Sequence, residues 1–311
     1  MKINGQTIEK GKITYVNLNV AKLPTHTLID IPVCVYRSKK DGPVLLLTAG
    51  IHGDELNGIE IIRNLIVSKS IRPSIGTVIA VPIVNVFGFL HNERYLPDGK
   101  DLNRCFPGKP NGSLASRIAY TLMKEVLPIV DLGVDFHTGG ASRSNFPQIR
   151  CEFSKRKSLE LAKAFSPPMI LNSKQLMGSF RREAYKKGKH ILVFEGGESL
   201  RFDDYSIGQG IRGVKKLMSH LGMKKYKVSK KRKKPVILPS STWIRARISG
   251  LFRSYIEYGD FVKKGQVIAS LTDPFGEAEV EVKVKNDGYI IGVNKHPVVN
   301  KGDAIVNLGA E

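Results

Sequence analysis

Short apolar runs alternate with stretches of helical periodicity in the middle of the chain. Continuous apolar runs of this length are typical of strands that are buried on both faces; they lie at 44–47, 77–84 and 191–194, and a further strand is predicted at 131–136. Between them, apolar residues recur at three- and four-residue spacing, which predicts helices; these begin near 59, 113, 159, 181 and 210. The alternation predicts a mainly parallel or mixed sheet with helices on both faces.

The two ends of the chain show a different pattern. Residues 1–40 form short alternating β-like stretches, with Pro24 and Pro32 between them, and predict antiparallel edge strands. Residues 239–311 are rich in valine and glycine, have no helical period and contain two similar turn phrases, at 258–268 and 298–305. The predicted organisation is an α/β domain, a basic linker and a small all-β domain, over 1–222, 223–238 and 239–311.

Length and composition place few limits on the fold. The 311 residues suffice for two domains, and 41% of them are apolar. No apolar stretch is long enough to cross a bilayer, and the first residues lack the apolar core of a signal peptide. Cys34, Cys105 and Cys151 are scattered and fit neither a disulfide framework nor a metal motif. We therefore expect reduced thiols and a cytoplasmic location.

The formal net charge of +21 suggests an anionic partner. Nucleic acid, an anionic membrane surface and a small anionic substrate would all satisfy it. Eight basic residues lie between Lys224 and Lys234 with no acidic residue among them. A solvated linker is the simpler interpretation of this segment, because like charges in a block repel and extend the chain. A binding arm is the alternative, but no aromatic pattern typical of RNA-binding domains accompanies it.

Candidate chemistry begins directly after the first strand, in the glycine-rich segment 50–58. His52 and Glu55 are three residues apart where a helix begins, so an imidazole nitrogen and a carboxylate oxygen can reach one zinc ion. This spacing is common by chance, so a third ligand is needed. His52, Asn85, His137 and Glu195 all follow predicted strands. In open α/β sheets the carboxyl ends of such strands face one crevice.

A hydrolytic zinc ion takes three protein ligands and keeps one position open for water. His52, Glu55 and His137 supply two imidazoles and one carboxylate. A lone histidine such as His137 is often structural, but its place at a strand end before Thr-Gly-Gly favours a ligand. Asp54 and Asp135 are candidates to orient the imidazoles, with ordinary surface hydrogen bonding as the alternative.

The proton transfer that hydrolysis requires has its own candidate. Glu195 reaches the same crevice on a glycine-flanked turn and is placed to accept a proton from water and pass it to a leaving amine. Glu198 is the competing carboxylate, farther from the strand end. The loop from Arg94 to Arg104 offers cationic and amide groups for an oxyanion and for a substrate carboxylate.

Four ordered motifs resemble the succinylglutamate desuccinylase/aspartoacylase family of the zinc carboxypeptidase clan. They are Gly50-Ile51-His52-Gly53-Asp54-Glu55, Arg94-Tyr95 followed by Asp101-Leu102-Asn103-Arg104, Asp135-Phe136-His137, and Glu195. The resemblance implies a zinc-carboxypeptidase-like fold and one zinc ion per chain on His52, Glu55 and His137. It further implies that Glu195 acts as general base and then acid, that Arg94 polarises the scissile carbonyl, and that Asn103 and Arg104 hold the substrate carboxylate.

The chain also departs from the family pattern. Asn85-Val86-Phe87 stands where aspartoacylases carry Asn-Pro-Arg, and the segment from Arg94 to Arg104 is longer. These differences leave the identity of the substrate open. The C-terminal part resembles the barrel-sandwich domains of biotinyl and lipoyl carriers, but Asp273-Pro274-Phe275-Gly276 occupies the hairpin tip where they carry Met-Lys-Met. We therefore expect a lid, an oligomer contact or a specificity wall there.

The sequence thus predicts a cytoplasmic zinc-dependent deacylase that hydrolyses the amide bond of an N-acyl amino acid or a related small anionic acyl amide. A zinc carboxypeptidase that acts on peptides would share the metal residues but would need an open groove. A non-catalytic protein that binds nucleic acid or an acidic partner through the basic segment is the alternative from another class. A homo-oligomer is compatible with the sequence, and a membrane span is not expected.

Overall fold

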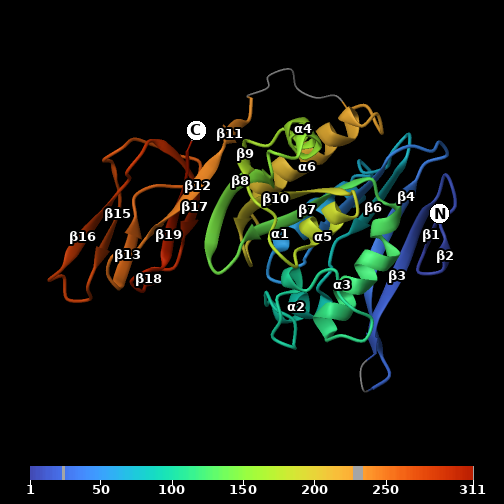
Figure 1. The fold of residues 1–311 in the computed structure, drawn as a ribbon, viewed down its shortest axis with the longest axis horizontal. Coiled ribbons are helices and arrows are strands. Elements are labelled where there is room, and N and C mark those ends of the chain that lie inside the picture. Colours follow the sequence, from blue (N-terminus) through green and yellow to red (C-terminus); the bar gives the residue numbers. More distant parts are fainter. Residues whose placement is uncertain (23–24, 227–233, 311) are drawn as a thin grey trace.

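A computed structural model describes residues 1–22, 25–226 and 234–310 (Figure 1). Its main feature is a mixed sheet of 13 strands whose longest path runs β12-β19-β17-β8-β10-β7-β5-β6-β4-β3. The α/β architecture with an all-β C-terminal region is confirmed. The orange and red C-terminal strands lie at one end of the molecule, beside β8, and the N-terminal strands lie at the other (Figure 1).

The centre of the sheet consists of four parallel strands, which confirms the four strands that the sequence predicts. In spatial order they are β10 (His190–Glu198), β7 (Leu132–Gly139), β5 (Val44–Ala49) and β6 (Thr77–Val81). Pro82 lies just beyond β6, so its missing N–H removes no hydrogen bond from the ladder. The predicted strand at 77–84 was therefore three residues too long.

Helices cover both faces of this central sheet. One face packs against α1 (Leu56–Val67), α4 (Arg156–Phe165) and α6 (Asp204–His220). The other face packs against α3 (Leu114–Glu125) and α5 (Phe180–Lys186). The segment between β6 and α3, which includes the predicted loop 94–104, contains α2 (Val86–His91) and a 3-10 turn (Leu102–Arg104), and a second 3-10 turn (Leu127–Ile129) follows α3.

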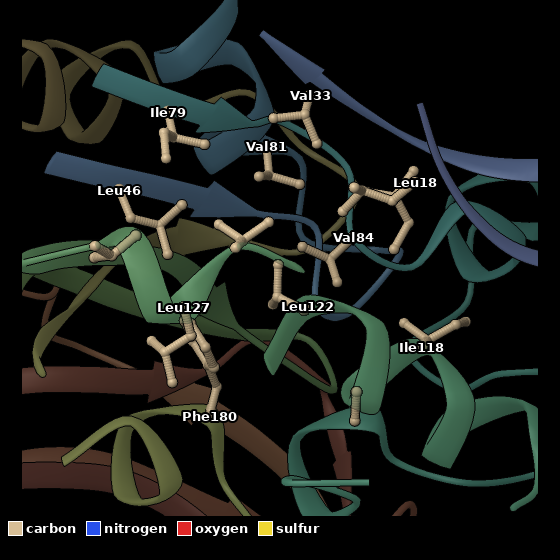
Figure 2. Close-up of a cluster of buried hydrophobic side chains, with 14 of the residues drawn as sticks. Leu18, Val33, Leu46, Ile79, Val81, Val84, Ile118, Leu122, Leu127 and Phe180 are labelled. Carbon is tan, nitrogen blue, oxygen red and sulfur yellow. The ribbon is translucent and has the colours of Figure 1, made fainter. Parts of the chain in front are cut away.

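Strand β5 shows why the central runs are apolar at every position. Leu45 and Leu47 belong to the core beneath α1, whereas Leu46 between them belongs to the core beneath α3. Figure 2 shows Leu46 in the core beneath α3, which also contains the Ile118 and Leu122 side chains of that helix. Because successive side chains of a strand point to opposite faces, a strand covered on both faces needs apolar residues throughout.

The N-terminal strands form the antiparallel edge that the sequence predicts. β3 (Ile13–Lys22) pairs with β4 (Leu28–Arg37), and β4 pairs with β6, both antiparallel. A short hairpin, β1 (Lys2–Ile3) and β2 (Gln6–Thr7), precedes them.

The other side of the sheet contains a strand that the sequence pattern did not predict. β8 (Arg143–Cys151) pairs antiparallel with β10. It also pairs with β17 (Gly288–Asn294) through its first residues and with β9 (Met169–Asn172) through its last residues. Through β17 the sheet continues into β19 (Ala304–Ala310) and β12 (Ser240–Arg245). The C-terminal region is therefore joined to the α/β part by continuous strand pairing, and the exact domain boundaries stay a prediction.

A second sheet completes the C-terminal region and packs on a core of its own. Its strands are β16 (Glu279–Lys283), β15 (Val267–Thr272), β13 (Gly250–Ser254) and β18 (Val298–Val299), while β14 (Phe261–Val262) pairs with β17. Most of the basic segment, 227–233, lies outside the described residues. The end of the predicted linker forms β11 (Val236–Leu238), which pairs in parallel with β9. No helix in the described part of the chain is long and apolar enough to cross a membrane.

Candidate metal centre and active site

The sheet topology gathers the candidate residues at one point. The chain adds β6 on one side of β5 and then β7 and β10 on the other side. In such sheets the crevice forms where the strand order reverses, beyond the carboxyl ends of the strands. Here that point lies between β5 and β7, and a cavity of about 560 Å³ opens beside it. Its lining includes His52, Glu55, His137 and Glu195.

The three predicted metal ligands converge on one another. Glu55 Oε1 lies 2.7 Å from His52 Nδ1, and Glu55 Oε2 lies 2.9 Å from His137 Nδ1. One nitrogen or oxygen atom from each residue falls within 4.8 Å of the other two, and all three side chains are buried. Two imidazole nitrogens and a carboxylate facing a common point form the kind of donor set that zinc prefers.

Carboxylates hold the outer nitrogens of both imidazoles. His137 Nε2 lies 2.7 Å from Asp135 Oδ2, and Asp135 also accepts a hydrogen bond from Thr48 Oγ1 at 2.8 Å. The expectation for Asp135 is therefore confirmed. The carboxylate beside His52 Nε2 belongs to Asp101, at 3.1 Å, rather than to Asp54. An outer carboxylate of this kind fixes the ring orientation and directs Nδ1 to the centre of the group.

At this site the charged neighbours of Glu55, His137 and Asp101 change the pKa of each group more than burial does, and in the opposite direction. Burial by itself would raise the pKa of Glu55, but the two neighbouring imidazoles hold that pKa well below its usual value. Burial would lower the pKa of His137, but Asp135 and Glu55 raise it well above its usual value. The pKa of Asp101 is lowered in spite of its partial burial, because His52 and Arg94 lie beside it. The cluster therefore favours charged carboxylates.

Glu195 reaches the cavity from β10, directly opposite His137 in the ladder. Both of its carboxylate oxygens are held by residues of β8. Asn145 Nδ2 donates to Oε2 at 3.0 Å, and Arg150 Nη1 lies 3.1 Å from Oε1. The competing carboxylate of Glu198 lies outside the cavity lining, 3.8 Å from Arg201 Nε. Of the two candidates, Glu195 is the one that lines the same cavity as the proposed metal group.

Arg94 lies at the edge of the metal group. Its Nη1 donates to Glu55 Oε1 at 3.1 Å, and its Nη2 donates to Asp101 Oδ2 at 3.0 Å. Asn85, which the sequence placed in the crevice, is instead fully buried beneath this loop: its side chain accepts from the Gly88 N–H and donates to the Arg94 carbonyl at 3.3 Å. Asn85 therefore shapes the segment that carries Arg94.

Asn103 and Arg104 both line the cavity, as the resemblance implies for residues that touch substrate. Asn103 Oδ1 accepts a hydrogen bond from the Phe180 N–H at 2.9 Å, so this oxygen anchors the start of α5. Arg104 is exposed, and its Nη1 donates to the Asn103 carbonyl at 2.8 Å. Within the described part of the chain, the Asn103 side-chain N–H groups donate no hydrogen bond and the Arg104 side chain donates only from Nη1, so these groups are available to a ligand.

Sequence reasoning missed several residues that line the cavity. Asn145 and Arg150 belong to β8, whose polar sequence has no apolar run to reveal it as a central strand. Trp243 comes from β12 in the C-terminal region, and Arg181 comes from α5. No spacing rule connects these segments to 50–58. Only the pairing of the strands brings them to the same cavity.

Comparison with known proteins now identifies the family. Residues 41–221 match the succinylglutamate desuccinylase/aspartoacylase catalytic domain. The chain belongs to this family. It is 31% identical, over 88% of its length and 84% of the relative, to the N-alpha-acetyl-L-2,4-diaminobutyric acid deacetylase of Halomonas elongata. The family match and this relative support a hydrolase of the deacylase type.

Solved structures of family members share the whole fold. The ectoine utilization protein EutE (DoeB) of Ruegeria pomeroyi, in a product-bound state, has a TM-score of 0.85 and 25% identity, and the match covers 98% of each chain. A succinylglutamate desuccinylase/aspartoacylase from Rhodobacter sphaeroides has a TM-score of 0.85 and 25% identity, with 100% of this chain and 99% of that chain covered. The similarity extends through the C-terminal β region, beyond the residues that match the catalytic domain.

Proposed function

We propose that this family member is a zinc-dependent deacylase that hydrolyses the amide bond of an N-acyl amino acid or a related small anionic acyl amide. The observation that carries the proposal is the convergence of His52, Glu55 and His137 next to Glu195 in one cavity. Family membership supports amide hydrolysis, and the donor set supports the metal.

The residues fit a zinc ion. Zinc would be held by Nδ1 of His52, Nδ1 of His137 and the carboxylate of Glu55. Their outer hydrogen bonds already select the tautomer that leaves each Nδ1 free to bind metal, because a proton on Nε2 satisfies Asp101 or Asp135. When bound, zinc supplies a Lewis acid that acidifies water and polarises a carbonyl group.

The protein's own residues would then transfer the proton, stabilise the oxyanion and bind the substrate. Glu195 accepts a proton from the attacking water and later donates it to the leaving amine. Asn145 and Arg150 hold the Glu195 carboxylate in place for both steps. Arg94 is held by one hydrogen bond to Glu55 and one to Asp101, and it presents its positive charge to the oxyanion that develops on the carbonyl oxygen as water adds to the acyl carbon. Asn103 and Arg104 contribute to binding the substrate carboxylate.

The shape of the site favours a small substrate. The cavity has a volume of about 560 Å³, its lining includes Trp243 of the C-terminal region and Leu176, and its five arginines outnumber its four carboxylates. Such a cavity suits a small anion better than an extended peptide, which needs an open groove. The related deacetylase from Halomonas elongata is named for an N-acetylated amino acid, and we propose a substrate of this class for the present chain.

Metal analysis together with a substrate screen tests the proposal. The purified protein should contain about one zinc ion per chain by elemental analysis, and His52→Ala and His137→Ala should each lose it. His91→Ala is the matched control, because His91 is an exposed residue of α2 that does not line the cavity. Release of free amine from a panel of N-acyl amino acids, including the N-acetyl-diaminobutyrate of the relative, should depend on the zinc. Full retention of zinc in both cavity variants would contradict the metal site.

The alternative functions predict different results. A peptide carboxypeptidase would release C-terminal residues from short peptides faster than it cleaves N-acyl amino acids. A non-catalytic nucleic-acid-binding protein would show steeply salt-dependent binding that disappears when the basic segment 224–234 is neutralised. Because most of that segment lies outside the described residues, its role stays a prediction. We also propose a cytoplasmic location, since all three cysteines are free thiols in the structure.

A further inference from the structure

Arginines supply the positive charge of the cavity, and most of them already have partners. Arg94 contacts Glu55 and Asp101, and Arg150 contacts Glu195. Arg181 donates to the backbone carbonyls of 150, 173 and 174. Arg143 is different. Among the described residues its guanidinium donates no hydrogen bond and forms no ion pair, and its Nε atom is buried without a partner.

The backbone around Arg143 is firmly placed. Ala141 and Ser142 both have positive φ, at 53° and 55°, and the Arg143 N–H donates to the Gly140 carbonyl at 3.3 Å. Positive φ at both central residues is typical of a type I′ turn, here formed without glycine or asparagine at those positions. The Lys295 N–H donates to the Ser142 carbonyl at 2.8 Å, so the C-terminal region holds the turn.

The Arg143 side chain rests on an aromatic ring. Its guanidinium carbon lies 5.5 Å from the centre of the Trp243 ring, and both residues line the cavity. Stacking satisfies the face of the guanidinium but leaves the N–H donors at its edge unused. These donors match the two oxygens of a carboxylate. The pair thus presents a preorganised fork for an anion, with one member from β8 and the other from β12.

We propose that Arg143, supported by Trp243, makes the main contact to the substrate carboxylate, so that the C-terminal region forms part of the substrate site. This inference rests on the proposed function and refines it. Arg104 is exposed, where solvent weakens a charge contact, and one side-chain atom of Asn103 is engaged by Phe180. Arg143 has a partly buried guanidinium with no competing anion, so it makes the stronger contact.

The test compares charge recognition in zinc-loaded variants. N-acetyl-L-alanine and its carboxamide differ only in the carboxylate, and succinate serves as a probe that has carboxylates but no amide to hydrolyse. In Arg143→Gln we expect KM for the carboxylate substrate and Kd for succinate, measured by isothermal titration, to rise about tenfold or more. The carboxamide should be unaffected and kcat nearly unchanged. Arg104→Gln should raise both constants by about threefold or less.

Further variants separate recognition from folding. Arg143→Lys keeps the charge but loses the planar fork, so its KM for the carboxylate substrate and its Kd for succinate should lie between those of the wild type and of Arg143→Gln. Trp243→Leu should weaken succinate binding about threefold, because it removes only the stacking. Arg253→Gln is the matched control, since Arg253 is exposed on β13 and outside the cavity. Zinc content reports whether each variant retains the folded site.

Each outcome decides one of the two proposals. Unchanged KM and Kd in Arg143→Gln, or a larger effect in Arg104→Gln, would overturn the role of Arg143 while leaving the deacylase intact. Unchanged affinity in Trp243→Leu would overturn the part assigned to the C-terminal region. Weaker succinate binding in Arg143→Gln, in a protein that hydrolyses no acyl amide of the panel, would support the carboxylate contact and contradict the proposed function.

Discussion

The α/β part and the C-terminal β region share one sheet but contribute to the site in different ways. The parallel strands β5, β7 and β10 carry the proposed metal ligands and general base at or near their carboxyl ends. The strands that continue the sheet beyond β8 are antiparallel to one another, and they bring Trp243 to the cavity wall. Parallel strands direct all their carboxyl ends to one edge, so reactive groups gather there. The antiparallel extension supplies shape and support.

The two regions meet in a row of residues that crosses the sheet. Trp243 pairs with Asn307, Asn307 with Gly292, and Gly292 with Asn145, whose amide donates to Glu195. Residues paired in this way project from the same face of the sheet. A Cβ atom at Gly292 would lie 2.7 Å from Asn145 Oδ1, so glycine leaves room for the Asn145 side chain. The C-terminal region thus borders the Asn145 side chain that donates to the proposed base.

Replacing the proposed base should give the largest effect. Glu195→Gln removes the proton acceptor but keeps the shape of the side chain, so kcat should fall by about a thousandfold while zinc stays bound. Steady-state hydrolysis and elemental analysis on the same preparation test both parts. Glu198→Gln is the matched control, because that carboxylate lies outside the cavity. Unchanged turnover in Glu195→Gln would remove this residue from the mechanism.

Zinc affinity should depend unequally on the two outer carboxylates. Asp135→Asn should weaken zinc binding by about 10- to 100-fold, because this carboxylate orients His137 and its side chain is only 1% exposed. Asp101→Asn should weaken zinc binding less than Asp135→Asn, since the Asp101 side chain is 15% exposed and solvent weakens its interaction with His52. Competition with a chromogenic chelator measures both affinities. Equal losses of zinc affinity in the two variants would show that the difference in burial between Asp135 and Asp101 does not affect their contributions.

A substitution at Gly292 tests whether the C-terminal region affects the position of Asn145 beside Glu195. Gly292→Ala should displace the Asn145 amide from Glu195 and lower kcat about tenfold, the cost of one hydrogen bond to a charged group. Stability should change little, because a side-chain tip rather than backbone must move. Asn145→Ala should have a similar effect on kcat, and the double variant should add nothing. Additive losses would mean that the two residues act separately.

Thiol labelling gives the smallest expected effect and reports on the strand where the regions join. Burial raises the pKa of the Cys151 thiol on β8 to about 11, from 9.0. A higher pKa leaves about a hundredfold less thiolate at pH 8, so iodoacetamide should label Cys151 slowly in the folded protein and normally in urea. Labelling should become faster as the pH approaches 11. Peptide mass spectrometry measures it, and rapid labelling at pH 8 would mean that β8 separates from its neighbours.

The sequence determined the elements whose pattern is local. The apolar runs that became β5 and β10 were predicted because strands buried on both faces need largely apolar residues. His52 and Glu55 were predicted as partners from their three-residue spacing at the start of a helix. The helix begins only at Leu56, and the two residues instead meet across the turn before it, where the Glu55 N–H donates to the His52 carbonyl. The family was recognised from motifs in a fixed order, and the comparisons confirm it.

Only the tertiary structure decided which polar residues complete the site. Strand β8 has no apolar run, so Asn145 and Arg150 gave no signal of their place beside Glu195. The outer partner of His52 proved to be Asp101, 49 residues away, and not its neighbour Asp54. Arg143 and Trp243 are 100 residues apart in sequence and meet because β17 and β19 pair between their strands. Periodicity records which face of an element is buried, whereas the register of distant strands fixes which polar side chains share a cavity.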